Sequence, residues 1–166
     1  MKKAIKNLVS ATFIAVLGFG VNFNSFAGDD SGSSTVVEIA VSNPDFSILV
    51  EAVKKAELVE ALSADGPFTV FAPTDEAFKN LFSQLGVEGI KDLSAEQLTP
   101  ILTYHVVSGK VMSTDLSNAS VATLNGQKIK IDLTNGVKIN ESKVVAADVE
   151  GKNGVIHVID RVLLPN

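Results

Sequence analysis

The spacing of apolar residues changes once along the chain, near Val106, and this change constrains the possible fold most strongly. Before it, apolar residues recur at the three- and four-residue intervals that place them on one face of a helix. After it, Ile129, Ile131 and Leu133 alternate with charged residues, as in a strand with one face in water. Helices followed by strands predict an α+β domain.

Capping residues mark two helix starts. Asn43 precedes Pro44, a pair that suits the N-cap and first position of a helix. Thr74 is a second N-cap, and the two acidic residues after it interact favourably with a helix N-terminus. Gly86 supplies a C-terminal stop for this second helix. A further short helix is predicted around residues 58–62.

A third helical region contains a proline that we expect to divide it. Ser94 and Gln97 form the pattern of a capping box. The ring of Pro100 would clash with an earlier carbonyl group of one continuous helix. We therefore predict a short helical turn after Ser94 and a second helix from Thr99, with Pro100 in its first turn.

Strand signals follow a different pattern. Residues 68–72 form a short apolar run before Pro73, and the nearly continuous apolar run 155–164 predicts a central strand buried on both faces. Asparagine–glycine pairs at 125–126, 135–136 and 153–154 suit the positive backbone angles of tight hairpin turns. We expect the later strands to be antiparallel.

The first 27 residues have the three parts of an export signal. Three lysines lie in the first six residues, an uncharged and mostly apolar stretch of 14 follows at 8–21, and Ser25 and Ala27 fit a cleavage site. This predicts a protein, bacterial in style, that is secreted or periplasmic after cleavage at Ala27. An uncleaved anchor is the alternative, but the apolar stretch is short of the roughly 20 residues of a membrane span.

The predicted mature chain is one domain. Residues 28–34 are small, polar and acidic, and we expect a disordered lead-in there. Residues 35–166 then form one domain of 132 residues, and no other stretch is apolar enough to span a membrane. We expect no further domain and no C-terminal anchor.

Composition excludes several functions. The chain has no cysteine, which rules out disulfides and cysteine-ligated metal centres. After removal of residues 1–27 it carries 11 basic and 19 acidic side chains, a net charge of −8 that disfavours nucleic-acid binding. No nucleophile elbow, phosphate-binding loop or zinc-binding helix motif is present, so we expect no catalytic residue, no metal and no cofactor.

The two histidines are the remaining candidates for chemistry. His105 lies on the apolar side of a predicted helix, and His157 interrupts the apolar run of the predicted central strand. We expect both to be structural residues whose ring nitrogens bond to neighbouring groups in the core.

Three blocks resemble the fasciclin domain, also called FAS1. They are the segment 66–78, the Tyr104–His105 pair, and the segment 153–165, in the order and at about the distances expected of that family. The resemblance covers essentially all of 35–166. It implies a FAS1 β-wedge of two sheets with several helices packed on it. It also implies a secreted, non-enzymatic adhesion module whose partner is a cell-surface or matrix protein or glycan.

The resemblance also implies where binding occurs. In animal members, integrin binding is linked to a tyrosine–histidine motif and to an aspartate–isoleucine pair. These fall on Tyr104 and His105, and on Asp148 and Val149, where valine replaces isoleucine. We predict that these four residues mark a recognition surface. Because Asp148 follows an apolar run and precedes a turn, we place it near a strand end; the alternative is that Asp148 only ends the strand and Val149 fills the core.

Two other functions stay open at this point. A small-molecule or lipid carrier would have an apolar cleft in the wedge. A hydrolase would have a water-accessible His105 or His157 bonded to a serine or carboxylate.

Overall fold

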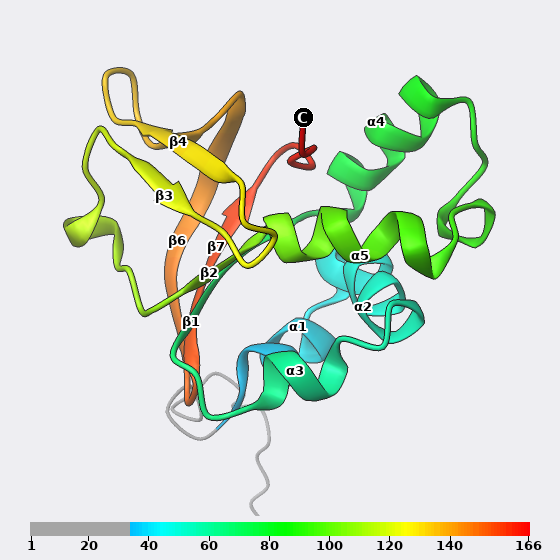
Figure 1. Cartoon of the computed structure of the whole chain (residues 1–166), viewed down its shortest axis with the longest axis horizontal. Helices are drawn as coiled ribbons and strands as arrows, with labels where there is room; N and C mark the ends of the chain where they lie inside the picture. Colours follow the sequence, from blue (N-terminus) through cyan, green and yellow to red (C-terminus); the bar gives the residue numbers. More distant parts are fainter. Residues whose placement is uncertain (1–33) are drawn as a thin grey trace, which may run out of the picture. The chain divides into compact units, whose positions relative to one another are not determined.

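The computed structural model describes residues 34–166, and Figure 1 shows their helices and strands. The predicted export signal at 1–27 and residues 28–33 of the predicted lead-in lie outside the described residues. In the described part, no helix is long and apolar enough to cross a membrane.

Most of the helices lie in the first half of the described chain, as predicted, although the first, Val36–Ser42, was not predicted. Thr35 and Glu38 form a capping box, the Asn43 side chain accepts the N–H of Asp45, and Thr74 accepts the N–H of Ala77. The α-helices are α1 (Val36–Ser42), α2 (Ser47–Lys55), α3 (Val59–Ser63), α4 (Asp75–Leu85) and α5 (Ala95–Tyr104), and the short 3₁₀ turns are η4 (Pro44–Phe46), η5 (Ile90–Asp92) and η6 (Ser113–Asp115).

The predicted break at Pro100 is wrong, because α5 is one helix with the proline inside it. Pro100 and Glu96 are both exposed, so the carbonyl group that loses its helical partner lies on the solvent side of the helix. Leu98 and Leu102 are buried on either side of the proline and hold the helix against the core. Packing therefore outweighs the local cost of the proline.

The strands form one continuous series in the order β2-β1-β7-β6-β5-β4-β3. Their bounds are β1 (Phe68–Pro73), β2 (Val106–Ser108), β3 (Ser120–Ala122), β4 (Lys128–Asp132), β5 (Lys138–Ile139), β6 (Ser142–Gly151) and β7 (Gly154–Ile159). In Figure 1, β3 and β4 cross at an angle to β1, β6 and β7. The N–H of Leu124, just after β3, donates to the carbonyl of Val106 in β2 (2.8 Å), so the two ends of the series meet.

β7 is the central strand of its part of the sheet, as predicted, but one of its pairings is parallel. It pairs antiparallel with β6 and parallel with the earlier strand β1. The pairings among the later strands β3 to β7 are antiparallel, as predicted, and the parallel pair with β1 was not predicted. β1 and β7 approach closely where Phe68 pairs with Gly154. A Cβ atom on Gly154 would lie 2.0 Å from the carbonyl oxygen of Phe68, so only glycine fits there.

The glycines of two of the three asparagine–glycine pairs have the predicted positive φ, but the asparagines before them do not, and both connections have five residues instead of forming a tight turn. Gly126 joins β3 to β4 with φ +95°, and Gly136 joins β4 to β5 with φ +89°. The third turn is different, because the residues between β6 and β7 are Lys152 and Asn153 and Gly154 already belongs to the strand. Asn153 is buried, and its side chain links the start of α1 to the end of α3 through bonds to Val36, Leu62 and Ala64.

The two faces of β1 and β7 carry separate cores. On one face, Val70, Ala72 and Ile156 pack against the helices. On the other face, Phe71 and Ile159 pack inside the wedge with Ile129, Ile131 and Ile139 from β4 and β5. The α+β class, with helices packed on one face of a wedge of strands, is therefore confirmed.

Candidate functional site

Tyr104 and His105 lie at the junction of α5 and β2, and both are buried. Each is 2% exposed, with Tyr104 as the last helical residue and His105 as the C-cap. The N–H of Phe71 donates to the carbonyl of His105 (2.8 Å), which ties the helix end to β1. In this conformation neither side chain presents a substantial surface to a macromolecular partner.

The two ring nitrogens of His105 are both bonded to the main chain. Nδ1 lies 2.7 Å from the carbonyl oxygen of Ile101, and the N–H of Leu163 donates to Nε2 (2.8 Å). Nε2 must accept, so Nδ1 carries the proton and the ring is neutral. Burial lowers the pKa of His105 to about 4, although the bond to Ile101 acts in the opposite direction. The expectation of a buried, hydrogen-bonded His105 is confirmed.

The Tyr104 hydroxyl connects three parts of the wedge. It donates to the carbonyl oxygen of Lys128 in β4 (3.2 Å) and accepts from the side-chain amide of Asn140, between β5 and β6 (3.1 Å). The ring packs in the wedge core. Together, Tyr104 and His105 fix α5 against β4 and against the C-terminal segment that contains Leu163.

Asp148 lies inside β6, not near its end, so the predicted placement is wrong. Ala146 pairs with Val158 and Val149 pairs with Ile156, which leaves Ala147 and Asp148 opposite His157 alone. This is a β-bulge, and Asp148 has φ +59° there. Aspartate tolerates this left-handed conformation better than most residues. The bulge depends on pairing with a distant strand, so local sequence does not reveal it.

The bulge directs the Asp148 carboxylate at η6. The main-chain N–H of Ser113 donates to it (2.6 Å), and the Ser113 hydroxyl donates to its other oxygen. These two bonds, the hydroxyl first, lower the pKa of Asp148, while partial burial opposes them. Asp148 is therefore an ionised carboxylate held in one orientation at neutral pH. Its neighbour Val149 is half-buried and packs against the helical core.

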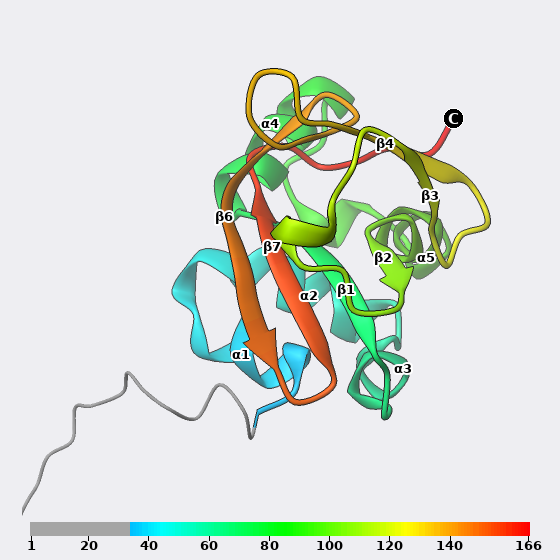
Figure 2. The same cartoon turned by 90° about the vertical axis from the view of Figure 1, so that its left-hand side faces the viewer.

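The segment Gly109–Ser113, here called the crossing segment, lies across three adjacent strands. The hydroxyl of Thr69 in β1 donates to the carbonyl of Gly109 (2.6 Å) and accepts from the N–H of Val111 (2.9 Å). His157 in β7 contacts the Val111 carbonyl (2.8 Å), and Asp148 in β6 binds Ser113. Figure 2 shows η6, at the end of this segment, in front of β7.

His157 is fully buried and holds the crossing segment against β6 and β7. Its Nε2 donates to the carbonyl of Val111, and its Nδ1 accepts the main-chain N–H of Asp148 (3.4 Å). The ring stacks on Phe71, with centroids 5.7 Å apart. Ser113, Asp148 and His157 are thus close together, but the histidine contacts the aspartate main chain and has no contact with the serine. The water-accessible histidine required of a hydrolase is absent at both positions.

Two hollows in residues 34–166 are large or apolar enough to compare with the lipid-carrier alternative, and neither fits it. The apolar one lies between α1, α2 and β1, has a volume of about 110 Å³, and is lined by residues such as Val37, Val50 and Val59. Ligand pockets for small molecules typically measure about 300–1,000 Å³. The larger hollow, about 900 Å³, lies between α4 and β4 and is mostly polar. Within the same residues, no three histidine, aspartate or glutamate side chains lie close enough to hold a metal ion.

The structure does not bring the two predicted pairs into contact. No hydrogen bond within residues 34–166 joins Tyr104 or His105 to Asp148 or Val149. The prediction also missed Ser113, because a serine in a polar loop carries no sequence signal for a contact 35 residues away. The four residues remain predicted binding residues, of which Asp148 alone combines partial exposure with a charge.

Comparison with known proteins identifies the family. The Fasciclin domain model matches residues 44–165. Protein sll1483 of Synechocystis is 49% identical over 142 residues, which cover 85% of this chain and 78% of the relative. Immunogenic protein MPB70 of Mycobacterium bovis is 33% identical, covering 78% of this chain and 68% of the relative. Transforming growth factor-beta-induced protein ig-h3 of the pig is 37% identical over 79% of this chain, but that match spans 19% of its own length.

A solved structure has the same fold. The FAS1 domain pair of the insect cell adhesion molecule fasciclin I matches with a TM-score of 0.68 at 23% identity, over 80% of this chain and 51% of the other. None of the relatives named here carries the name of an enzyme. The sequence blocks, the wedge and these matches agree, and the chain belongs to the Fasciclin domain family.

Proposed function

We propose that this protein is exported and acts as a non-enzymatic adhesion module that binds a protein or glycan at a cell surface or in an extracellular matrix. The observation that carries the proposal is the Fasciclin match over residues 44–165. The structural match to a cell adhesion molecule supports the same class of function.

The chemistry of the wedge supports a binding role rather than a catalytic one. A general base has to reach the proton that it removes. His105 and His157 are buried, and both ring nitrogens of each already contact main-chain groups. Asp148, the most constrained carboxylate of the site, is bonded to Ser113, and no cation within residues 34–166 forms an ion pair with it.

The proposed recognition surface is the β6 bulge together with the crossing segment. Asp148 has a left-handed backbone, a conformation that persists only where the surroundings fix it. Val145, just before the bulge, is 56% exposed and offers an apolar contact beside the charge. Tyr104 and His105 act as positioning residues in this proposal, because they hold the wedge together from inside.

Asp148→Asn tests the role of the charge. The amide keeps an acceptor for Ser113 but removes the negative charge, so we expect a folded protein with weakened adhesion to immobilised envelope and matrix fractions. Asp132→Asn is the matched control, because Asp132 likewise accepts the N–H and hydroxyl of one neighbour, Thr134. Adhesion should be measured by surface plasmon resonance, with circular dichroism to verify the fold.

The double variant Asp148→Ala with Val149→Ala removes the whole predicted pair. If correctly folded double variant adheres as the parent does, the pair has no recognition role. If Asp148→Asn and Asp132→Asn weaken adhesion equally, the effect is one of net charge, and the bulge is not the site.

Export is tested separately by the intact mass of protein recovered from the culture. We expect a mature chain that begins at Gly28, after cleavage at Ala27. A full-length mass in the membrane fraction would instead indicate an uncleaved anchor.

A further inference from the structure

The large polar hollow lies between α4 and the strands, and the charge balance of the strand half differs from that of the helices. Residues 34–105 carry 4 basic and 11 acidic side chains, whereas residues 106–166 carry 7 basic and 6 acidic ones. Three of these seven cations, Lys128, Lys130 and Arg161, line the same hollow of about 900 Å³. We call this hollow with its lining the basic groove.

Hydrogen bonds hold the main chain that carries the cations of the groove. Lys128 and Lys130 point to one side of β4, because Ile129 between them is buried in the wedge. The Lys130 N–H donates to the Asn140 side chain (2.8 Å), and the Lys130 carbonyl accepts from the Asn140 N–H (2.7 Å). The Arg161 carbonyl accepts from the hydroxyl of Ser142 (3.0 Å). These bonds fix the backbone from which the cationic side chains extend.

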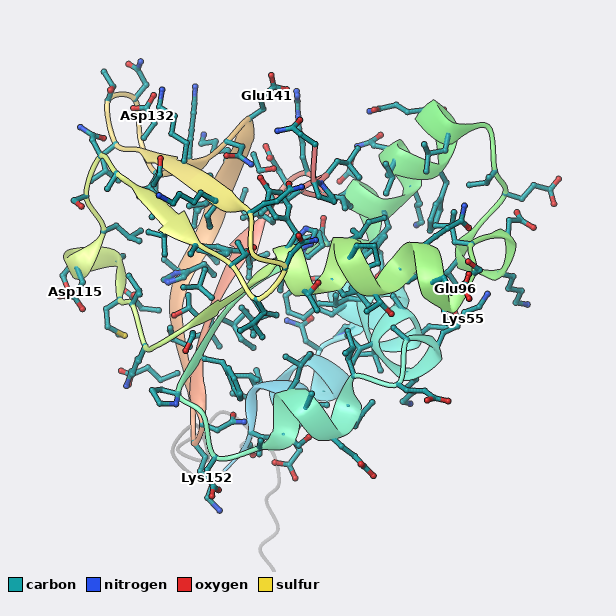
Figure 3. All side chains as sticks on the ribbon, viewed as in Figure 1. Lys55, Glu96, Asp115, Asp132, Glu141 and Lys152 are labelled. Atoms are coloured by element: carbon teal, nitrogen blue, oxygen red, sulfur yellow. The ribbon has the colours of Figure 1, made fainter. Side chains whose placement is uncertain are left out.

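These positive charges are not neutralised by the protein itself. Within residues 34–166 the one ion pair is Lys110–Glu150, which lies outside the groove. Glu141 is the single acidic side chain among the lining residues, which also include Asn166 with its terminal carboxylate. It lies at the turn between β5 and β6, at the upper edge of the view in Figure 3. Three cationic side chains therefore face one acidic side chain and the terminal carboxylate, in a described chain whose side chains sum to a net charge of −6.

The opposite wall of the groove is polar and uncharged. Asn80, Ser83 and Gln84 lie three and four residues apart on the exposed face of α4. Amides and hydroxyls both donate and accept hydrogen bonds, which matches the hydroxyl groups of a sugar. Lysine and arginine on the other wall match carboxylate or sulfate groups. The volume is within the range of clefts that enclose small ligands.

We infer that the basic groove binds an acidic polysaccharide, through its uronate carboxylates or sulfate esters. The groove is separate from the β6 bulge, so this inference adds a second site, with its own class of ligand, to the proposed binding function. A nucleic acid is disfavoured because single-stranded binding relies on exposed aromatic side chains, and the one aromatic residue of the groove, Tyr104, is buried. An acidic peptide offers the same charges without the sugar hydroxyls that the α4 wall matches.

The test measures binding of the exported protein by isothermal titration calorimetry. The probes are polygalacturonate for carboxylates, dextran sulfate for sulfate esters, poly-L-glutamate for an acidic peptide, and neutral dextran. We expect one or both acidic polysaccharides to bind, with an affinity that falls as salt is added. Poly-L-glutamate should bind more weakly, and dextran should not bind.

A pair of charge-matched variants locates the binding. Lys128→Gln with Arg161→Gln should reduce the affinity about five- to twentyfold, since each exposed ion pair contributes up to about fivefold. Lys91→Gln with Lys143→Gln removes the same charge outside the groove and should change the affinity less than about twofold. If the groove double variant loses its melting transition, the single variant Lys130→Gln replaces it.

Each outcome decides the proposal. Equal losses in the two double variants, an unchanged affinity in the groove variant, or preferential binding of poly-L-glutamate would overturn it. If no polyanion binds but the protein still adheres to envelope or matrix fractions, the groove inference is wrong and the proposed adhesion function stands. If the protein adheres to none of these materials, the proposed function itself is wrong.

Discussion

Lowering the pH is expected to weaken the fold through His105. The ring is buried with both nitrogens bonded, and burial holds its pKa at about 4, against about 6.5 in an unfolded chain. Between these two values the unfolded chain binds a proton at this position and the folded chain does not. Stability therefore decreases as the pH falls through this range.

The size of the effect follows from the two pKa values of His105. Their difference corresponds to roughly 3 kcal/mol of unfolding free energy, of which about 2 kcal/mol is lost by pH 5. The loss levels off below about pH 4, where the folded chain also takes up the proton. Above pH 6.5 the contribution is fully present.

Urea unfolding of the parent and of His105→Gln at pH 7 and pH 5 isolates this contribution. Glutamine has a donor and an acceptor but does not titrate, and the other groups cancel in the difference between the two proteins. At pH 7 the variant should be less stable by about 1–3 kcal/mol, because a buried partner loses its bond. At pH 5 this gap should shrink by about 2 kcal/mol. A gap that is the same at both pH values refutes the account of His105 as a neutral buried ring.

Two further changes test how the strands and helices are joined. Gly154→Ala should destabilise the fold by more than about 2 kcal/mol in a thermal melt, because the new Cβ would lie 2.0 Å from the Phe68 carbonyl oxygen. The control Gly89→Ala, which has open space around it, should change stability by less than about 0.5 kcal/mol. Similar effects of the two variants would contradict the close approach of β1 and β7. Asn153→Ala should lower the free energy of unfolding in urea by about 3 kcal/mol or more, since it leaves one buried N–H and two carbonyl groups without hydrogen-bond partners. Asn135→Ala, at an exposed turn, should cost much less, and an equally small cost for Asn153→Ala would mean that its three bonds do not hold α1 and α3.

Local chemistry made much of the fold predictable. The caps at Thr74 and Ser94, the alternation along β4 and the positive φ of Gly126 all depend on neighbours within a few residues. The three blocks that resemble FAS1 are likewise sufficient to identify the family from the amino-acid sequence. The burial of His105 followed from its place on an apolar helical face.

What the sequence could not determine depends on contacts between distant segments. The parallel pairing of β1 with β7 joins residues more than 80 positions apart. The bulge at Asp148 exists only because β6 places two residues opposite one residue of β7. Continuity of α5 through Pro100 depends on burial of Leu98 and Leu102 against other elements.

The basic groove illustrates the same division. The alternating pattern showed that Lys128 and Lys130 lie on the wet face of a strand. It could not show that Arg161, about 30 residues later, lies in the same hollow, or that α4 forms its opposite wall. Periodicity fixes the face on which a side chain lies, because it reflects the geometry of one element. The tertiary structure decides which faces meet, because packing joins elements that the chain keeps far apart.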